Sequence, residues 1–232
     1  KDVFQRHVYG ENPFNVEMMY RRVYSSGFTQ RPDPTIMGAF SGLEIACWDI
    51  IGKSLDKPIW QLLGGKVRNK LRSYSYLYPA LKQNAREFYS SPNLSTDAAI
   101  EASKLGFTAV KFDPAGPYTI YDGHQPSMAN MALSEKFCKS IRSALGDKID
   151  ILFGTHGQFT AAGAIRLASK IAQYSPLWFE EPVPPDNYEA MRRVVENAKI
   201  PIATGERLTT KYEFYNVLNI AAPAIVQPAL GR

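Results

Sequence analysis

The sequence predicts an α/β fold with a parallel sheet, of the (β/α)₈ barrel type, and three observations predict it. From about residue 71 onward, short apolar stretches of strand length alternate with amphipathic stretches of helix length. Such strands pair in parallel, because the chain must cross back through each helix before the next strand begins. The last few strand–helix repeats are spaced at about 23 to 26 residues, and no G-x-G-x-x-G or phosphate-binding loop follows a strand, which favours a barrel over a doubly wound sheet.

Composition places the chain among ordinary globular proteins. Of its 232 residues, 45% are hydrophobic and 21% are charged, which excludes disorder as the main state. We expect no membrane span and no signal peptide, because apolar runs are short and the first residues lack an apolar core. The net charge of +5 is scattered, so we expect a mixed solvated surface and no nucleic-acid partner. Cys47 and Cys138 lack metal-ligand spacing, which predicts reduced core thiols in a cytoplasmic protein.

The segment 1–66 contains little that resembles a strand, and its apolar pattern predicts helix. Five residues recur there at helical spacing, namely Ala39, Leu43, Ala46, Cys47 and Ile50. A second short helix is expected over 59–63, and Gly64 and Gly65 end it.

The elements expected after residue 70 alternate in type. The expected strands are 71–77, 109–113, 149–153, 177–180, 202–204 and 224–227. The expected helices are 96–105, 134–145, 161–174, 188–197 and 211–220.

Ionisable side chains follow the expected strands at their carboxyl ends, where barrel active sites lie. Lys111 and Asp113 end the second strand, His156 follows the third, and Glu180 and Glu206 follow the fourth and fifth. Because strand side chains alternate, Lys111 and Asp113 share one face. We therefore expect an ammonium, an imidazole and several carboxylates to meet in one cavity.

This combination predicts a magnesium site with proton-transfer groups beside it. Glu180 and Glu206 would repel each other without a cation between them, and oxygen ligands suit a hard divalent ion such as Mg²⁺. Lys111 and His156 could then move a proton on and off the carbon beside a bound carboxylate. Each residue also has a structural interpretation: Glu-Glu-Pro as a surface turn, Lys111 as a strand-end lysine and His156 as a loop histidine.

Four stretches carry a resemblance to a known family: GLEIACWDIIGKSLDKPIWQLLGG, VKFD, LWFEEPVPPDN and PIATGERL. Together they resemble the enolase superfamily, within it the mandelate racemase and muconate-lactonizing group, over residues 37–230. The resemblance implies Mg²⁺-assisted removal of the proton next to a carboxylate, usually of a sugar acid. In that comparison Glu180 and Glu206 match the second and third metal ligands. Lys111 matches the first lysine of a Lys-x-Lys pair, and Asp113 replaces the second.

Two positions depart from the family pattern. The first metal ligand of the family is an Asp on the third strand, where this chain has Gly154. Asp150 lies roughly 13 Å away along the strand and cannot replace it. Asp113 is the expected replacement, and the alternatives are ligation by His156 or weak metal binding. Ala229 stands where relatives commonly carry an Asp, so Lys111 or His156 would remove the proton.

Candidate substrate-binding residues lie in loops at the expected barrel mouth. The long loop after the second strand contains Tyr121 and His124, which bind substrate or belong to a rigid surface excursion. Gln158 follows His156 closely, and Arg207 next to Glu206 could pair with a substrate carboxylate or a neighbouring glutamate.

Taken together, the sequence predicts an incomplete barrel of about six strands at residues 71–232 and a helical remnant of a capping domain at residues 1–70. We expect a piece of a longer chain, because the sixth strand ends five residues before the last residue. The expected activity is acid-sugar dehydration with Mg²⁺. Cycloisomerisation or epimerisation of a sugar acid or lactone is the first alternative, and a catalytically silent binding or structural relative is the second. Relatives also imply a homo-oligomer.

Overall fold

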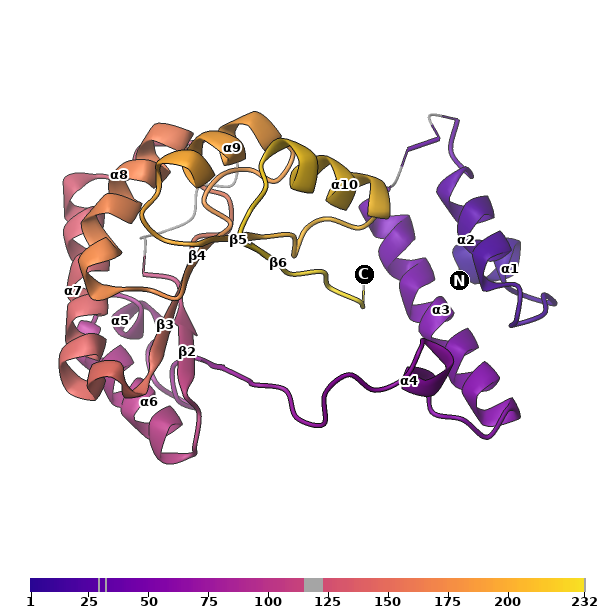
Figure 1. The fold of residues 1–232 in the computed structure, drawn as a ribbon, viewed down its shortest axis with the longest axis horizontal. Helices are drawn as coiled ribbons and strands as arrows, with labels where there is room; N and C mark the ends of the chain where they lie inside the picture. Colours follow the sequence, from indigo (N-terminus) through magenta and orange to yellow (C-terminus); the bar gives the residue numbers. More distant parts are fainter. Residues whose placement is uncertain (29, 32, 115–122, 232) are drawn as a thin grey trace. The chain divides into compact units, whose positions relative to one another are not determined.

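The computed structural model describes the chain apart from residues 29, 32, 115–122 and 232 (Figure 1). The chain forms two compact units. The first unit comprises Lys1–Leu71, Arg207–Glu213 and Pro228–Arg232, and the second comprises Arg72–Glu206 and Phe214–Gln227. The sequence does not indicate that the two short later segments group with the first unit.

The first unit is helical, in agreement with the pattern of its apolar residues. Its helices are α1 (Asp2–His7), α2 (Val16–Tyr24), α3 (Pro34–Ser54) and α4 (Ile59–Leu62). Helix α3 begins at Asp33, whose side chain accepts hydrogen bonds from the backbone N–H groups of Thr35 and Ile36. The core is formed mainly by residues of α2 and α3, which are Val16, Met19, Val23, Met37, Phe40, Cys47 and Ile51.

Among the described residues, α3 is long and apolar enough to cross a membrane by length and composition. The core helix of a soluble protein meets the same criterion, and α3 contributes Met37, Phe40, Cys47 and Ile51 to the core of the first unit. Cys47 and Cys138 are both buried and free of disulfides, as predicted.

The second unit is built on a six-stranded sheet whose strands are all parallel and follow the order β1-β2-β3-β4-β5-β6. The strands are β1 (Ser75–Tyr76), β2 (Ala109–Phe112), β3 (Asp150–Gly154), β4 (Trp178–Glu180), β5 (Ile202–Thr204) and β6 (Ile225–Val226). The helices are α5 (Ala85–Phe88), α6 (Pro92–Lys104), α7 (Met128–Leu145), α8 (Ala161–Ile171), α9 (Tyr188–Asn197) and α10 (Lys211–Ile220), of which the part before Phe214 groups with the first unit. Two 3₁₀ turns follow α7 and α8, at Gly146–Lys148 and Ala172–Tyr174.

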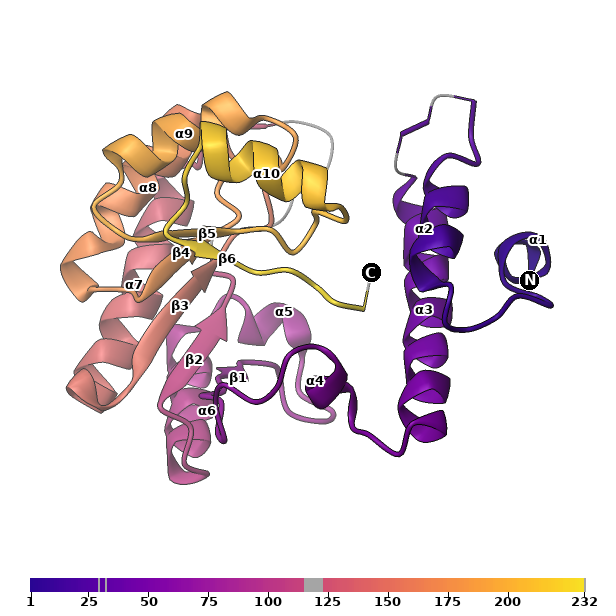
Figure 2. The ribbon, with the colours of Figure 1, turned by 45° about the vertical axis from the view of Figure 1, so that its right-hand side comes forward.

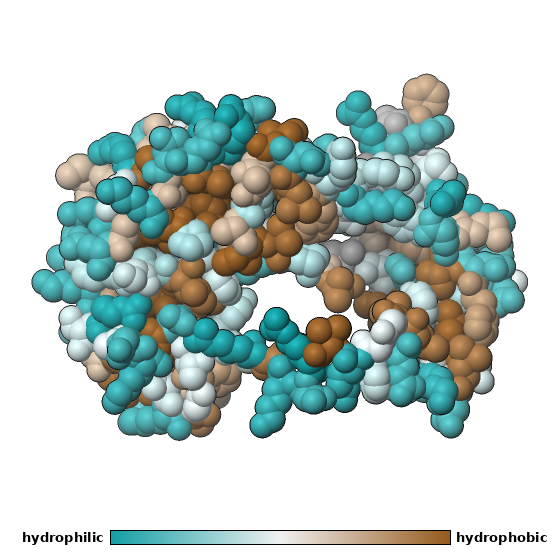
Figure 3. Space-filling model, in the orientation of Figure 1, coloured by the Kyte–Doolittle hydropathy of each residue, from teal (hydrophilic) through white to brown (hydrophobic). Residues whose placement is uncertain are grey.

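The strand order confirms the barrel-type topology that the repeat spacing predicts. A doubly wound sheet reverses its strand order, whereas here each strand pairs with the next one along the chain. When every crossover has the same handedness and each new strand is added on the same side of the last one, the connecting helices all lie on one side of the sheet. Figure 2 shows this for α6 to α10. Hydrophilic residues line the outer side of α7, α8 and α9 (Figure 3).

The register assigns the two faces of the sheet. Phe112, Phe153 and Phe179 pair across β2, β3 and β4, and their rings follow one another at centroid distances of 6.0 and 5.4 Å. The ring of Phe137 on α7 lies 6.0 Å from that of Phe112, so this face packs against helices. Lys111 alternates with Phe112 and therefore lies on the opposite face.

Several element boundaries differ from the predicted ones. Helix α7 begins at Met128 rather than 134, because Ser127 caps it by accepting a hydrogen bond from the N–H of Asn130. Helix α6 begins at Pro92 rather than 96, because Ser91 caps it and Pro92 suits the first helical position. Strand β1 pairs only at Ser75–Tyr76, much shorter than 71–77.

Candidate active site

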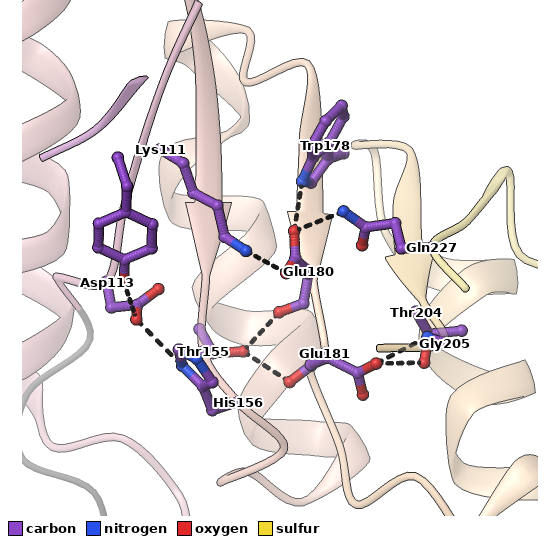
Figure 4. A network of polar contacts seen from close by, with 11 residues as sticks. Lys111, Asp113, Thr155, His156, Trp178, Glu180, Glu181, Thr204, Gly205 and Gln227 are labelled. Atoms are coloured by element: carbon purple, nitrogen blue, oxygen red, sulfur yellow. Dashed lines mark hydrogen bonds and ion pairs between the residues drawn. The ribbon is translucent and has the colours of Figure 1, made fainter. Parts of the chain in front are cut away.

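Polar side chains gather at the carboxyl ends of the strands, on the face opposite the helices (Figure 4). The register places Lys111 of β2 beside Leu152 of β3, and Gly154 beside Glu180 of β4. The sheet therefore brings the predicted lysine and the predicted glutamate to one place, although 69 residues separate them.

Lys111 and Glu180 form a buried ion pair, with side chains only 7% and 3% exposed. The second carboxylate oxygen of Glu180 accepts hydrogen bonds from Trp178 Nε1 at 2.9 Å and Gln227 Nε2 at 3.0 Å. Neither Trp178 nor Gln227 was expected from the sequence. Trp178 could have been found from the alternation of side chains along β4, because it lies two residues before Glu180 and therefore on the same face.

The lysine of this pair is held in its charged form. Burial alone would lower the pKa of Lys111, but the hydrogen bond and charge of Glu180 outweigh burial and raise that pKa above its ordinary value. The Nζ atom also lies 5.7 Å from the ring centroid of Tyr76 and 5.9 Å from that of Tyr74, both favourable for a cation. In its charged form Lys111 can donate a proton or stabilise negative charge.

A second polar group joins Tyr76, Asp113 and His156 from three neighbouring strand ends. His156 Nδ1 lies 3.0 Å from Asp113 Oδ2, and the Tyr76 hydroxyl donates to the same oxygen. In a neutral histidine that donates from Nδ1 to a carboxylate, Nε2 is the nitrogen that carries the basic lone pair. His156 therefore has the arrangement of a general base. Tyr76 was not expected from the sequence, because only the pairing of β1 with β2 brings it close to Asp113.

Asp113 also occupies the space that a side chain at Gly154 would need. A Cβ atom added at Gly154 would overlap Asp113 Oδ1 and lie 3.2 Å from Asp113 Cγ. The Asp113 carboxylate of the second strand thus fills the space beside Gly154 on the third strand. That Asp113 takes over from the residue missing at 154 remains a prediction.

Hydrogen bonds connect the segment that follows β3 with the end of β4. Thr155 Oγ1 donates to the backbone carbonyls of Glu180 and Glu181, at 3.0 and 2.8 Å. His156 and Glu181 both have left-handed backbones, with φ of 54° and 45°. Glu181, which the sequence analysis did not single out, is buried, and its Oε1 accepts from Thr204 Oγ1 at 2.9 Å and from the Gly205 N–H at 2.7 Å.

The predicted ligands Asp113, Glu180 and Glu206 fit a hard cation in donor chemistry but do not form a finished site. In the described part of the chain, no three acidic, histidine or cysteine side chains stand close enough to hold a metal ion. Lys111, Trp178 and Gln227 already bind the Glu180 carboxylate. The position of Asp113 over Gly154 is the observation that favours a metal, because it restores a carboxylate beside Glu180.

The predicted substrate-binding residues have different outcomes. The segment of His124 pairs with the exit of β3: its N–H donates to the Gln158 carbonyl at 3.2 Å, and its ring lies against Phe159. Gln158 is 4% exposed, and neither of its side-chain amide atoms has a hydrogen-bond partner within the described structure. Tyr121 lies outside the described residues. Arg207 belongs to the first unit and Glu206 to the second.

Two family models match the chain. The one described as "Enolase C-terminal domain-like" matches residues 95–232, and the one described as "Mandelate racemase / muconate lactonizing enzyme, N-terminal domain" matches residues 2–64.

Individual relatives agree with the family models. The chain is 32% identical over 232 residues to a D-xylonate dehydratase of Haloferax volcanii, covering 96% of this chain and 54% of that protein. It is 31% identical over 226 residues to a D-galactonate dehydratase of Klebsiella pneumoniae, covering 97% of this chain and 55% of that protein. A mandelate racemase/muconate lactonizing enzyme-like protein from Roseovarius sp. TM1035 has a solved structure that matches with a TM-score of 0.95 and 61% identity, over 100% of this chain and 58% of that one. The chain thus spans about half the length of the curated relatives that it matches.

Proposed function

Because the chain belongs to the mandelate racemase/muconate lactonizing enzyme family of the enolase superfamily, we propose that it works as an acid-sugar dehydratase. Such an enzyme removes the proton next to the carboxylate of a sugar acid and then expels the neighbouring hydroxyl group as water. Two relatives named as dehydratases of D-xylonate and D-galactonate support this choice of reaction and substrate class.

The observation that carries the proposal is the pairing of His156 with Asp113 beside a buried, charged Lys111. One group can accept a proton and the other can stabilise negative charge, and the sheet register brings their strand ends together. General bases of this kind contribute about 10²–10⁴-fold to a rate.

In the proposed reaction, His156 Nε2 accepts the proton from the substrate carbon, and the electron pair of the broken C–H bond moves onto the substrate carboxylate. Asp113 holds the imidazole in orientation and stabilises the imidazolium that forms. The imidazolium of His156 then gives its proton to the departing hydroxyl, while the electron pair returns from the carboxylate to form the C2–C3 double bond and the C3–O bond breaks. Water leaves, and the enol that remains tautomerises to the 2-keto-3-deoxy acid. The Lys111 ammonium lowers the energy of the negative charge that develops between these steps.

Mg²⁺ is part of this proposal, and Asp113, Glu180 and Glu206 are the residues that would hold it. A bound Mg²⁺ would supply positive charge next to the substrate carboxylate. For substrate hydroxyls we propose Gln158, whose buried amide has no partner within the described structure, together with His124 and Tyr121. Arg207 is proposed to pair with the substrate carboxylate. Assembly into a homo-oligomer and a cytoplasmic location remain predictions.

Elimination and epimerisation begin with the same removal of the proton next to the carboxylate, and they differ in whether a hydroxyl then leaves or a proton returns to the opposite face. The names of the two dehydratase relatives are what favours elimination. Cycloisomerisation shares the first step and differs in the group that leaves.

The test is NMR of D-xylonate and D-galactonate in D₂O with the protein and millimolar Mg²⁺. We expect exchange of the proton next to the carboxylate and the appearance of a 2-keto-3-deoxy acid. Exchange without water loss, followed by ring closure or inversion, would instead support the isomerase alternative. Thermal unfolding with and without Mg²⁺ completes the test, because an ion that binds the native state raises its stability. A protein without a stability shift and without exchange would be the silent relative.

A further inference from the structure

Two residues at neighbouring strand exits have a backbone that normally favours glycine. His156 after β3 has φ of 54° and Glu181 after β4 has φ of 45°. Glycine adopts this left-handed region at little cost, whereas other residues persist in it only when their surroundings fix them. His156 has a role in the proposed reaction, and Glu181 has none so far.

The side chain of Glu181 binds the exit of the next strand, β5. Its Oε1 accepts from the Thr204 hydroxyl at 2.9 Å and from the Gly205 N–H at 2.7 Å. Gly205 has φ of 122°, and a Cβ there would lie 3.0 Å from the ring of Phe214, so this turn has little freedom. The residue that follows this turn is Glu206, a proposed metal ligand.

The backbone of Glu181 binds the exit of the preceding strand, β3. Its carbonyl accepts hydrogen bonds from Thr155 Oγ1, at 2.8 Å, and from the Gly157 N–H. These donors flank His156 on both sides. One buried residue therefore contacts both turns from which the proposed base and a proposed ligand project (Figure 4).

We propose that Glu181 is a positioning residue, which fixes the β5 exit, and with it Glu206, relative to His156. This inference rests on the proposed function for the roles of Glu206 and His156. It requires a hydrogen-bond acceptor at the end of the side chain, and it does not require the charge. Removing the acceptor frees the Gly205 turn, while the bonds to the backbone carbonyl keep the His156 turn in place.

Glu181→Leu and Glu181→Gln are the matched variants, because glutamine keeps an oxygen acceptor and leucine does not. Amide exchange of Gly205 and Gly157, measured by NMR, reports the two turns separately, and calorimetry reports Mg²⁺ affinity. In Glu181→Leu we expect Gly205 to exchange at least tenfold faster, Gly157 to stay within threefold of the wild type, and Mg²⁺ affinity to fall at least tenfold. In Glu181→Gln all three values are expected within threefold.

Three outcomes would overturn the inference: an unchanged Gly205 in Glu181→Leu, an unchanged Mg²⁺ affinity despite faster exchange, or equal losses in the leucine and glutamine variants. If the wild type binds no Mg²⁺, the result contradicts the metal in the proposed function. The ratio of Gly205 to Gly157 amide exchange still decides whether Glu181 fixes the turn. If Glu181→Leu does not fold, Thr204→Val replaces it, since it removes one of the two donors and is expected to speed Gly205 exchange at least threefold. An unchanged Gly205 in Thr204→Val would then overturn the inference.

Discussion

The two edges of the sheet use charged side chains in opposite ways. At the amino edge, Arg142 donates to the backbone carbonyls of four residues before β3 and β4, which are Gly146, Ile149, Tyr174 and Ser175. Arg72 pairs there with Asp150 at 2.6 Å, and these side chains are 52% and 36% exposed. At the carboxyl edge, the Lys111–Glu180 pair is almost completely buried.

We infer from this difference that the charged residues at the amino edge stabilise the fold, whereas those at the carboxyl edge serve the proposed reaction. Arg142 is half-buried and Arg72 is exposed, and solvent that reaches their guanidinium groups reduces the cost of their charge while they bind loop carbonyls. Buried charges are costly unless they are paired, so stability alone does not explain why several of them lie at the carboxyl edge. The proposed reaction explains them, and substitutions at each edge should therefore have different effects.

The largest effect is expected for His156→Asn, at the carboxyl edge. Asparagine tolerates the left-handed backbone of this position, so the turn should be kept while the base is lost. We expect proton exchange in D₂O to slow by about 10²–10⁴-fold, with little change in the free energy of unfolding. Exchange that survives in His156→Asn and disappears in Lys111→Met would show that the lysine is the principal base.

Lys111→Met should produce the largest loss of stability. Removing one partner of a buried ion pair leaves the other charge uncompensated, which costs about 3–5 kcal/mol. Urea unfolding at neutral pH measures this loss, and Glu180→Gln in the same background should recover part of it. A loss below about 1 kcal/mol, as found for exposed ion pairs, would mean that water reaches the Glu180 carboxylate.

The pH dependence of this variant follows from the raised pKa of Lys111. A lysine whose pKa is higher in the folded state stabilises the fold below its unfolded pKa, which is about 10.4, and stops doing so as the pH rises through the folded value. The stability difference between wild type and Lys111→Met should therefore be constant near neutral pH and shrink only above about pH 10.4. A difference that shrinks already between pH 7 and 9 would contradict this.

Gly154→Ala tests the crowding between β2 and β3. The added Cβ overlaps the Asp113 carboxylate, and overpacking of this kind costs about 1–3 kcal/mol. We also expect slower proton exchange, because a displaced Asp113 releases His156. In an Asp113→Ala background the same substitution should cost almost nothing, and an equal cost in both backgrounds would show that the strain lies elsewhere.

The smallest effect is expected at the amino edge. Arg72→Met removes a partly exposed ion pair, which should cost about 1 kcal/mol or less. Proton exchange should match the wild type. A large loss of activity in this variant would contradict the proposal that the two edges have different roles.

Sequence reasoning predicted the parallel topology and the edge at which the polar side chains gather, because strand alternation and the βα order depend on local pattern. From the family resemblance it also suggested that Asp113 replaces the carboxylate missing at Gly154. That role, the metal ligands Glu180 and Glu206 and the substrate contacts remain predictions. The early starts of α6 and α7 were missed because their serine caps precede the apolar pattern.

Other parts of the site depend on distant pairing that the sequence does not show. Tyr76 reaches Asp113 across 37 residues from a strand of only two residues. The second glutamate of the Glu-Glu-Pro stretch looks like a turn residue until its left-handed backbone and its bonds to β5 are seen. Such contacts belong to the folded sheet rather than to any local motif.

The close approach of Gly154 and Asp113 couples two positions on different strands. A side chain gained at 154 while Asp113 remained would require the Asp113 carboxylate to move, so we expect an acidic residue at one of the two positions rather than at both. Relatives should accordingly fall into two sets, one with an acidic third strand and one with an acidic second strand. Motif searches that demand the third-strand Asp will pass over the second set.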